Sequence, residues 1–327
     1  MENYILFYGD KKPEDNILIT NMFKNSRKIN LCWTELDYNN DLKVIEEEIK
    51  KGIEQIIFLG LEIGWDKLIL KIKENHSNLK VKVICNTMDS LLYYEYEREN
   101  FFKLLELSKN KSIDDIGFLR KSQYITYSSI GYGCSHIFED FNLDENLKEE
   151  YDKKIKIEKE KINVGIYPLN YVWNKNIFNQ LCIAKFVENS VVNFNDLDPR
   201  MKEFLDTMKI DNIPNKIEKI DYKNLKDNIS KNNVTVSCSF TEYMHPVFFI
   251  SMELGIPCLI GNNSDFFDEN SELQKYIVTT TEDNPIINAE KVNVILKQRD
   301  EIIRLYKEWK KDYSKKAKES IEQFIRK

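Results

Sequence analysis

The sequence predicts an α/β protein built from two parallel-sheet domains. Three observations carry this prediction. The chain has 327 residues, which corresponds to about two domains at roughly 150 residues each. Apolar runs of strand length alternate with segments of helical period in both halves, a rhythm typical of βαβ units. A nearly all-charged stretch, residues 143–161, separates the two rhythms and interrupts the apolar pattern.

The first half opens on the apolar run of residues 4–8, which Gly9-Asp10 closes and which we interpret as a buried strand. Further strands are predicted at 55–60 and 81–85, and helices at 42–51, 65–73 and 91–108. The charged stretch then gives our domain division: a first domain over residues 1–155 and a second domain over 156–327. A surface helix within a single domain is the alternative interpretation of the same stretch.

The second half repeats the pattern. Strands are predicted at 162–167, 190–194, 233–240 and 256–260, and helices at 174–189, 224–230 and 246–254. Two Rossmann-like halves in tandem are the simplest assembly of these elements. Residues 292–327 read as one long helix with an apolar stripe that packs on a core. Its lysine-rich face is interpreted as solvated because acids are interspersed, with a membrane-surface role as the alternative.

Composition excludes several classes of protein. The net charge of -6 argues against a protein that coats nucleic acid, since phosphate neutralisation needs a basic surface. The apolar run at the N-terminus is too short for a signal peptide, and no run approaches the roughly 20 residues of a membrane helix. The six cysteines form no CxxC pair, so no structural zinc site is expected and a reducing compartment fits. We therefore expect a cytoplasmic protein.

The most informative segment is residues 234–263, which reads as strand, turn with a carboxylate, helix, glycine, proline and strand. Ligands of open α/β sheets bind at the carboxyl ends of strands, and Glu242 stands at such an end. Ser239 and Thr241 suit a helix N-terminus, whose free N–H groups favour phosphate. The Glu242 carboxylate can accept hydrogen bonds from two vicinal ribose hydroxyls. Alternatively, Glu242 is simply a favourable acid in the first turn of a helix.

A second segment, residues 165–176, follows the first strand of the second half and leads into a helix. Lys175 lies near the predicted helix N-terminus, where its charge would add to the helix dipole and cradle a diphosphate. The alternative is an ordinary exposed Lys175, with Trp173 packed on the domain surface.

Together these segments resemble the donor-binding half of GT-B glycosyltransferases. Glu242, Gly255 and Pro257 fall at the spacing of that group, and Trp173-Asn-Lys175-Asn176 is similar to its phosphate-binding entry. The resemblance implies two facing Rossmann-like domains, the first on the acceptor side and the second binding the nucleotide sugar, with a C-terminal helix that crosses back to the first. It implies sugar transfer from a nucleotide-diphosphate sugar, UDP-linked, to a glycan, lipid-linked or protein acceptor, with no metal and no further cofactor. The implied donor-binding residues are Trp173, Lys175, Asn176, Ser239, Thr241, Glu242 and His245.

The sequence departs from this group where many retaining members carry a second Glu, because that position is Ile250 and the nearest acid is Glu253. Pro246 also falls where the usual Gly-rich loop sits. A non-catalytic partner subunit therefore stays open, as do the stereochemical outcome and peripheral membrane association. A metal-dependent transferase that uses Asp196 and Asp198 is a further alternative. A two-domain sugar receptor is a third, against which the missing signal peptide argues.

No catalytic base is assigned. Asp10, Asp66 and Asp89 follow strand-like runs and are candidates by position only, and Arg120-Lys121 could close over a donor phosphate. None of the three histidines, His76, His136 and His245, is assigned as the base.

Overall fold

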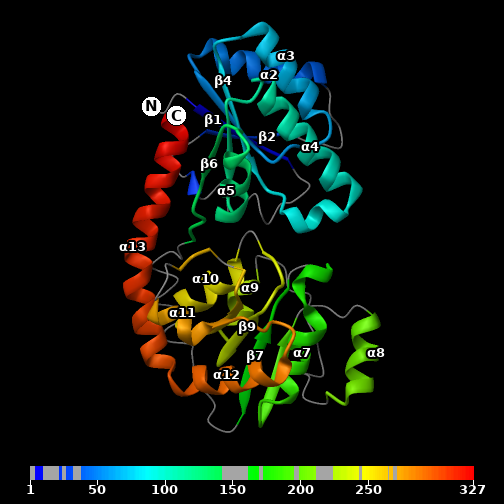
Figure 1. Ribbon diagram of the computed structural model, residues 1–327, viewed down its shortest axis with the longest axis vertical. Coiled ribbons are helices and arrows are strands. Elements are labelled where there is room, and N and C mark those ends of the chain that lie inside the picture. Colours follow the sequence, from blue (N-terminus) through cyan, green and yellow to red (C-terminus); the bar gives the residue numbers. More distant parts are fainter. Residues whose placement is uncertain are drawn as a thin grey trace. The chain divides into compact units, whose positions relative to one another are not determined.

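A computed structural model of the chain describes residues 4–9, 22–23, 27–31, 38–141, 161–168, 172–194, 199–210, 224–242, 245–263, 265–267 and 271–327 (Figure 1). The chain divides into two compact units. Unit 1 comprises Met1–Asp140 and Ser314–Lys327, and unit 2 comprises Phe141–Tyr313. Each unit contains a parallel sheet with helices, so the predicted α/β class is confirmed.

The described part of unit 1 contains a six-stranded sheet in the order β2-β1-β3-β4-β5-β6, and all its pairs are parallel. The strands are β1 (Tyr4–Tyr8), β2 (Arg27–Asn30), β3 (Gln55–Leu59), β4 (Lys80–Cys85), β5 (Asp115–Phe118) and β6 (Cys134–His136). From β2 onward each crossover moves in one direction across the sheet. Right-handed crossovers therefore place the connecting helices on one face. These helices are α2 (Tyr38–Lys50), α3 (Trp65–Asn75), α4 (Glu95–Lys109) and α5 (Lys121–Ser129).

The main core of unit 1 lies between this face and these helices (Figure 1). Helix α3 presents Trp65, Leu68 and Ile72 at helical period, and all three are fully buried. Phe58 of β3 stacks on Phe7 of β1 with ring centroids 5.5 Å apart. Strand β3 is buried on both faces, which is why it reads as a near-continuous apolar run in the sequence.

The end of the last helix, α13 (Arg299–Arg326), packs on the sheet of unit 1. Lys82 of β4 is fully buried, and its Nζ donates to the carbonyl oxygens of Phe324 and Ile325. Lys80 Nζ donates to the carbonyl of Lys327 at 2.8 Å. The last carbonyls of a helix lack partners within the helix, so the two lysines supply the missing donors.

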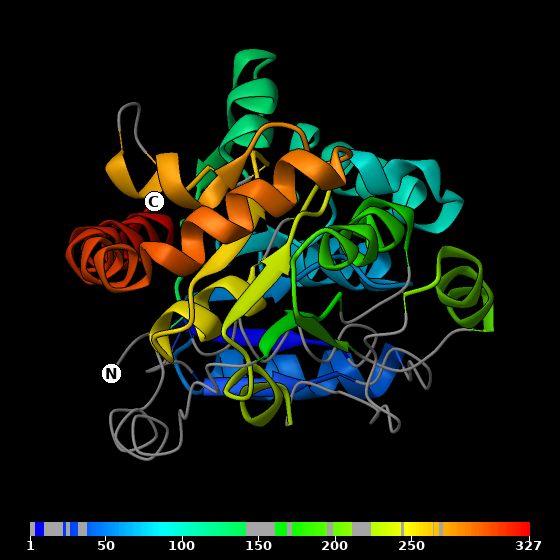
Figure 2. The same ribbon diagram turned by 90° about the horizontal axis from the view of Figure 1, so that it is seen from below.

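The described part of unit 2 contains a five-stranded parallel sheet in the order β11-β10-β9-β7-β8. Its strands are β7 (Ile162–Ile166), β8 (Ser190–Phe194), β9 (Val234–Ser237), β10 (Cys258–Gly261) and β11 (Val278–Thr279). Right-handed crossovers place α7 (Ile177–Lys185) on one face, where it packs beside α12 (Pro285–Lys297) (Figure 2). They place α9 (Leu225–Ile229), α10 (Pro246–Glu253) and α11 (Glu272–Ile277) on the other face. Helix α8 (Pro199–Met208) follows β8.

Aromatic side chains join α10 to the first part of α13 in unit 2. Phe248 and Phe249 contact Trp309, whose ring stacks on Tyr313 at 4.4 Å between centroids. The apolar stripe predicted for the tail is this packing surface. The prediction of one continuous helix from residue 292 is wrong, because the tail consists of α12 and α13 with a break at Gln298.

The predicted domain division between residues 155 and 156 lies outside the described residues and stays a prediction. The units differ from the predicted domains at both ends of unit 2, which begins at Phe141 and ends at Tyr313. Residues Ser314–Lys327, grouped with the second domain from sequence, belong to unit 1. The reason is physical: the end of α13 gains its carbonyl partners from β4.

Candidate functional site

The carboxyl edge of the unit 2 sheet carries most of the predicted site residues. A cavity of about 20 Å³ lies there, and Lys175, Ser239, Glu242 and His245 all line it. Its volume is near that of a single water molecule. The segments after β7 and β9 meet here because the carboxyl ends of parallel strands share one edge.

Lys175 ends a short 3₁₀ turn, η3 (Trp173–Lys175), that leads into α7. The next residue, Asn176, has a left-handed backbone conformation with φ +53°, which asparagine adopts more readily than most residues. Its Nδ2 donates to the carbonyl of Cys238 at 3.0 Å and to that of Glu282 at 2.8 Å. These bonds fix the turn to the end of β9, so Lys175 is held beside Glu242.

Lys175 and Glu242 form an ion pair within the cavity. Their side chains are only 11% and 10% exposed. The Ser239 hydroxyl lies 3.4 Å from the same carboxylate oxygen, Oε2, and donates to it. Burying two charges is costly unless each keeps its partner, so the loss of either one leaves the other poorly compensated.

His245 occupies the N-cap position of α10, just before Pro246, whose fixed φ suits the first helical turn. Asn263 Nδ2 donates to the carbonyl of Ser239, so Asn263 Oδ1 faces His245 Nε2 at 3.2 Å. The imidazole Nε2 therefore carries the hydrogen of this bond. Gly261 permits the approach, because a Cβ there would lie 2.8 Å from the carbonyl oxygen of Ser239.

The other predicted donor-binding residues lie nearby but outside the lining. Trp173 is 53% exposed and its ring lies 6.4 Å from that of Phe240. Thr241 contributes its carbonyl oxygen, which accepts from Asn174 Nδ2 at 3.0 Å. The Asn176 side chain is occupied by the backbone bonds described above, and its backbone N–H donates to the carbonyl of Trp173 at 3.1 Å.

Tyr167 and Gln180 are among the lining residues that were not predicted from sequence. Tyr167 follows β7, and its hydroxyl donates to the carbonyl of Asn228 and accepts from Asn232. Burial raises the pKa of Tyr167, so the hydroxyl keeps its proton. Gln180 of α7 donates to the carbonyl of Lys175 at 2.6 Å. Tyr167 could have been predicted as a site residue, because it is a polar residue at the end of an apolar strand-like run. No local sequence pattern indicated Gln180.

Helix α10 carries the position where many retaining enzymes have a second Glu. Ile250 stands there and is fully buried, and Glu253 accepts a hydrogen bond from Tyr306 at 3.0 Å. Asp196 and Asp198, the candidate metal ligands, lie outside the described residues, as does Asp10. Within the described ranges, no group of three or more His, Cys, Asp or Glu side chains could hold a metal ion.

In unit 1, Asp89 accepts hydrogen bonds from Gln123 and Tyr127, each at 3.1 Å. Burial, reinforced by the Asp89 charge, raises the pKa of Tyr127. The carboxylate oxygen Oδ2 of Asp66 lies 4.0 Å from Lys103 Nζ.

The remaining candidates of unit 1 are packed or exposed. His136 packs against Phe138 with ring centroids 4.3 Å apart. Arg120 precedes α5, and Lys121 is the first residue of that helix. His76 lies in the loop between α3 and β4.

No protein-family model matches the sequence, and no curated protein matches it significantly. Solved structures match along the whole chain. Sucrose-phosphate synthase from Thermosynechococcus elongatus aligns with a TM-score of 0.72 at 12% identity, covering 99% of this chain and 98% of that one. Anabaena HepE in complex with UDP-glucose gives 0.68 at 10% identity, with 98% of both chains covered. A UDP-forming α,α-trehalose-phosphate synthase from Burkholderia xenovorans gives 0.67 at 8% identity, covering 100% and 99%. The chain has a GT-B fold.

The GT-B fold confirms the fold implied by the sequence resemblance. Its second Rossmann-like half is unit 2, the half in which Lys175 and Glu242 meet. None of the helices in the described ranges has both the length and the apolarity to cross a membrane.

Proposed function

We propose that this GT-B protein is a glycosyltransferase that takes a sugar from a nucleotide-diphosphate sugar, UDP-linked, and passes it to a glycan, lipid-linked or protein acceptor. The observation that carries the proposal is the meeting of Lys175 and Glu242 in one cavity at the carboxyl edge of unit 2. The structural neighbours support it, since one is described as UDP-forming and another was solved with UDP-glucose. The acceptor and the cytoplasmic location stay predictions.

The chemistry asks for positive charge where the diphosphate leaves. The Lys175 ammonium lies one residue before the αL turn at Asn176, and the first N–H groups of α7 follow directly. A helix N-terminus and a lysine together stabilise the developing negative charge of the leaving group. This arrangement needs neither a metal ion nor a further cofactor, and we propose that the enzyme works without them.

Donor binding would then exchange partners within the cavity. The cavity is too small for a diphosphate, so Lys175 and Glu242 must separate as the donor enters. The diphosphate replaces the carboxylate as the partner of Lys175. The carboxylate is released to accept hydrogen bonds from the two ribose hydroxyls. The ion pair thus keeps Lys175 and Glu242 in place until the substrate arrives. Breaking the pair then reduces the net free energy of donor binding.

Removal of the Lys175 charge should remove most of the affinity for nucleotide diphosphates. A ligand at a hundred times its dissociation constant raises the free energy of unfolding by about 2.7 kcal/mol. In a thermal-shift titration with UDP and UDP-glucose, we expect Lys175→Ala to lose most of the stabilisation that the wild-type chain shows. Isothermal titration of the same variant measures the loss of affinity directly.

The control is Lys202→Ala, which removes an equal charge from an exposed position of α8 in the same unit. It should bind UDP as the wild type does. A wild-type chain that is not stabilised by any nucleotide diphosphate, or a Lys175→Ala variant that binds UDP undiminished, would refute the donor site.

A non-catalytic partner subunit is the second candidate, and Ile250 is the observation that favours it. The position carries a buried isoleucine where many retaining enzymes place a carboxylate. Donor hydrolysis by the purified chain separates the two candidates, since a binding subunit would bind UDP-glucose without consuming it. Activity that survives a chelator would remove the metal-dependent alternative that uses Asp196 and Asp198.

A further inference from the structure

Two aromatic side chains are exposed beside the Lys175–Glu242 ion pair of unit 2. Trp173 is 53% exposed and Phe240 is 40% exposed, and their ring centroids lie 6.4 Å apart with the planes tilted by 33°. Each precedes one member of the ion pair by two residues. Single exposed apolar residues are common on protein surfaces, but an adjacent aromatic pair next to buried charges indicates a surface that a ligand covers.

Backbone hydrogen bonds hold the two rings in place. The carbonyl of Asn174 accepts from the N–H of Phe240 at 2.8 Å, and Asn174 Nδ2 donates to the carbonyl of Thr241 at 3.0 Å. The carbonyl of Trp173 accepts from the N–H of Asn176 at 3.1 Å. The backbones that carry the rings are therefore fixed relative to each other before any ligand binds, which lowers the entropy lost on binding.

The exposed ring faces suit the apolar side of a sugar ring. An aromatic face carries partial negative charge, whereas the C–H groups of a sugar are weakly positive because their carbons bear oxygen. One side of a pyranose presents several of these C–H groups together. Stacking the two surfaces removes apolar area from water and adds this electrostatic attraction.

The position of the aromatic pair favours the sugar of the donor over its base. In a nucleotide-diphosphate sugar, the sugar is bonded directly to the terminal phosphate, whereas the ribose separates the base from the diphosphate. Trp173 belongs to the same 3₁₀ turn as Lys175, the residue proposed to hold the diphosphate. A sugar bonded to that diphosphate would therefore lie within reach of the two rings.

Helix α10, which the structure describes in full, gives the sugar no polar contact. Its two polar side chains are engaged elsewhere, Ser251 with Thr235 at 2.7 Å and Glu253 with Tyr306 at 3.0 Å. The remaining side chains of the helix are apolar. This composition fits recognition of the sugar through a ring face rather than through carboxylates from α10.

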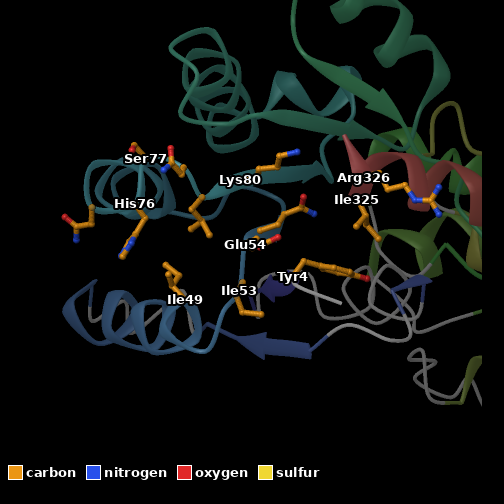
Figure 3. Close-up of a pocket in the computed structure, with 13 residues that line it drawn as sticks. Tyr4, Ile49, Ile53, Glu54, His76, Ser77, Lys80, Ile325 and Arg326 are labelled. Carbon is orange, nitrogen blue, oxygen red and sulfur yellow. The ribbon is translucent and has the colours of Figure 1, made fainter. Parts of the chain in front are cut away.

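A groove in unit 1 shows why the aromatic pair is the more specific feature. The groove has a volume of about 790 Å³ (Figure 3). Its walls combine the apolar side chains of Ile49 and Ile53 with both signs of charge, from Glu54 and Lys80. This mixture favours no class of ligand, whereas two exposed ring faces beside a lysine match a ring that is bonded to an anion.

From these observations we infer that Trp173 and Phe240 form the stacking surface for the transferred sugar of the donor. The two residues position this sugar and take no part in breaking its bond to the diphosphate. The inference rests on the proposed function, because Lys175 must hold the diphosphate for the sugar to reach the rings. Stacking on the nucleobase is the alternative that the test must separate.

The test compares UDP with UDP-sugars by isothermal titration of the full-length chain. The dissociation constant of UDP, divided by that of UDP-glucose, UDP-galactose or UDP-N-acetylglucosamine, gives the contribution of each sugar. For the sugar with the highest wild-type ratio, Trp173→Ala and Phe240→Ala should each lower the ratio by about three- to tenfold, or roughly 0.6–1.4 kcal/mol. The affinity for UDP itself should stay as in the wild type.

The matched control is Phe186→Ala, which removes a ring that is 46% exposed just after α7 in the same unit. It should leave every dissociation constant unchanged. Trp173→Phe keeps an aromatic face and should retain part of the sugar contribution, which a folding defect would not. The chain has four tryptophans, so the Trp173 indole signal can be assigned by NMR of this variant. The UDP-sugar should shift that signal more than UDP does.

Two results would overturn the inference. One is an unchanged ratio for every sugar in both alanine variants. The other is an equal loss of affinity for UDP and the UDP-sugars, because the rings would then hold the base. Either result leaves UDP binding and its loss in Lys175→Ala intact. A wild-type chain that binds none of these nucleotides refutes the proposed function itself, so the two failures are distinguishable.

Discussion

At the scale of single residues, Lys82 shows what burial does to a charge. The side chain is fully buried, and burial lowers its pKa to about 8, while the nearby carboxylate of Asp115 opposes the shift. The unfolded chain would titrate near the ordinary value of 10.5. Between these two values the unfolded state holds a proton that the folded state has released. The free energy of unfolding contributed by Lys82 therefore rises with pH across this window and is lost as pH falls through 8.

Lys82→Met should remove this pH dependence. The stability difference between wild type and variant is expected to grow by at most about 1.4 kcal/mol per pH unit between pH 8 and 10.5, and to stay flat below pH 8. Hydrogen exchange of the β4 amides at several pH values measures it, because these amides report on unit 1. Parallel pH profiles for the two proteins would show that folding does not shift the pKa of Lys82.

The sequence predicted which residues form the candidate site better than it predicted how they bond to one another. Lys175, Ser239, Glu242 and His245 were predicted, because strand ends and helix starts leave local patterns. The pairing of Lys175 with Glu242 was not predicted, since it joins residues 67 positions apart. Asn176 illustrates the same limit. Its pattern suggested a ligand contact, whereas its side chain bonds to the backbone after β9 and after β11.

At the scale of elements, apolar runs predicted most strands, and the failures have physical causes. Strand β5 was not predicted because it begins with a charged residue, Asp115, which interrupts the apolar pattern. In the structure Asp115 is buried and accepts hydrogen bonds from Ser135 and Lys327. Helix α5 and strand β6 are short and mostly polar, and they gain stability from tertiary packing that no local period reveals. The break at Gln298 follows no glycine or proline, so nothing in the tail marked it.

The packing of α13 on β5 depends on the absence of a side chain at Gly117. A Cβ at Gly117 would lie 2.4 Å from Ile137 Cδ1 and 3.2 Å from the Phe324 ring. Gly117→Ala should therefore displace Ile137 and crowd the Phe324 ring of α13, and destabilise unit 1 by about 1–3 kcal/mol. Denaturant unfolding of the variant gives the value.

Gly133→Ala is the matched control, because its Cβ would meet only the Asp114 carbonyl at an ordinary 3.4 Å. It should change stability little. Equal losses from the two substitutions would indicate a general cost of replacing glycine rather than a clash with Ile137 and Phe324.

At the scale of the whole molecule, two segments far apart in sequence build unit 1. A chain that ends at Tyr313 would lose the carbonyl partners of Lys80 and Lys82 and the Phe324 ring against Gly117. We expect such a truncation to unfold unit 1, with loss of hydrogen-exchange protection in β4 and β5, while β7 and β9 of unit 2 stay protected. UDP binding by the truncated chain checks unit 2 independently. Full protection of β4 and β5 after truncation would show that the helix end is dispensable.

The split origin of unit 1 also has a consequence for biosynthesis. A ribosome delivers Met1–Asp140 first and Ser314–Lys327 only after all of unit 2 has been made. At roughly 5–20 residues per second, the early sheet waits on the order of ten seconds for its missing piece. Throughout that delay Lys82 Nζ lacks its hydrogen-bond acceptors, the carbonyl oxygens of Phe324 and Ile325. Nascent chains should therefore engage chaperones through their early half, and release should coincide with emergence of the final turns.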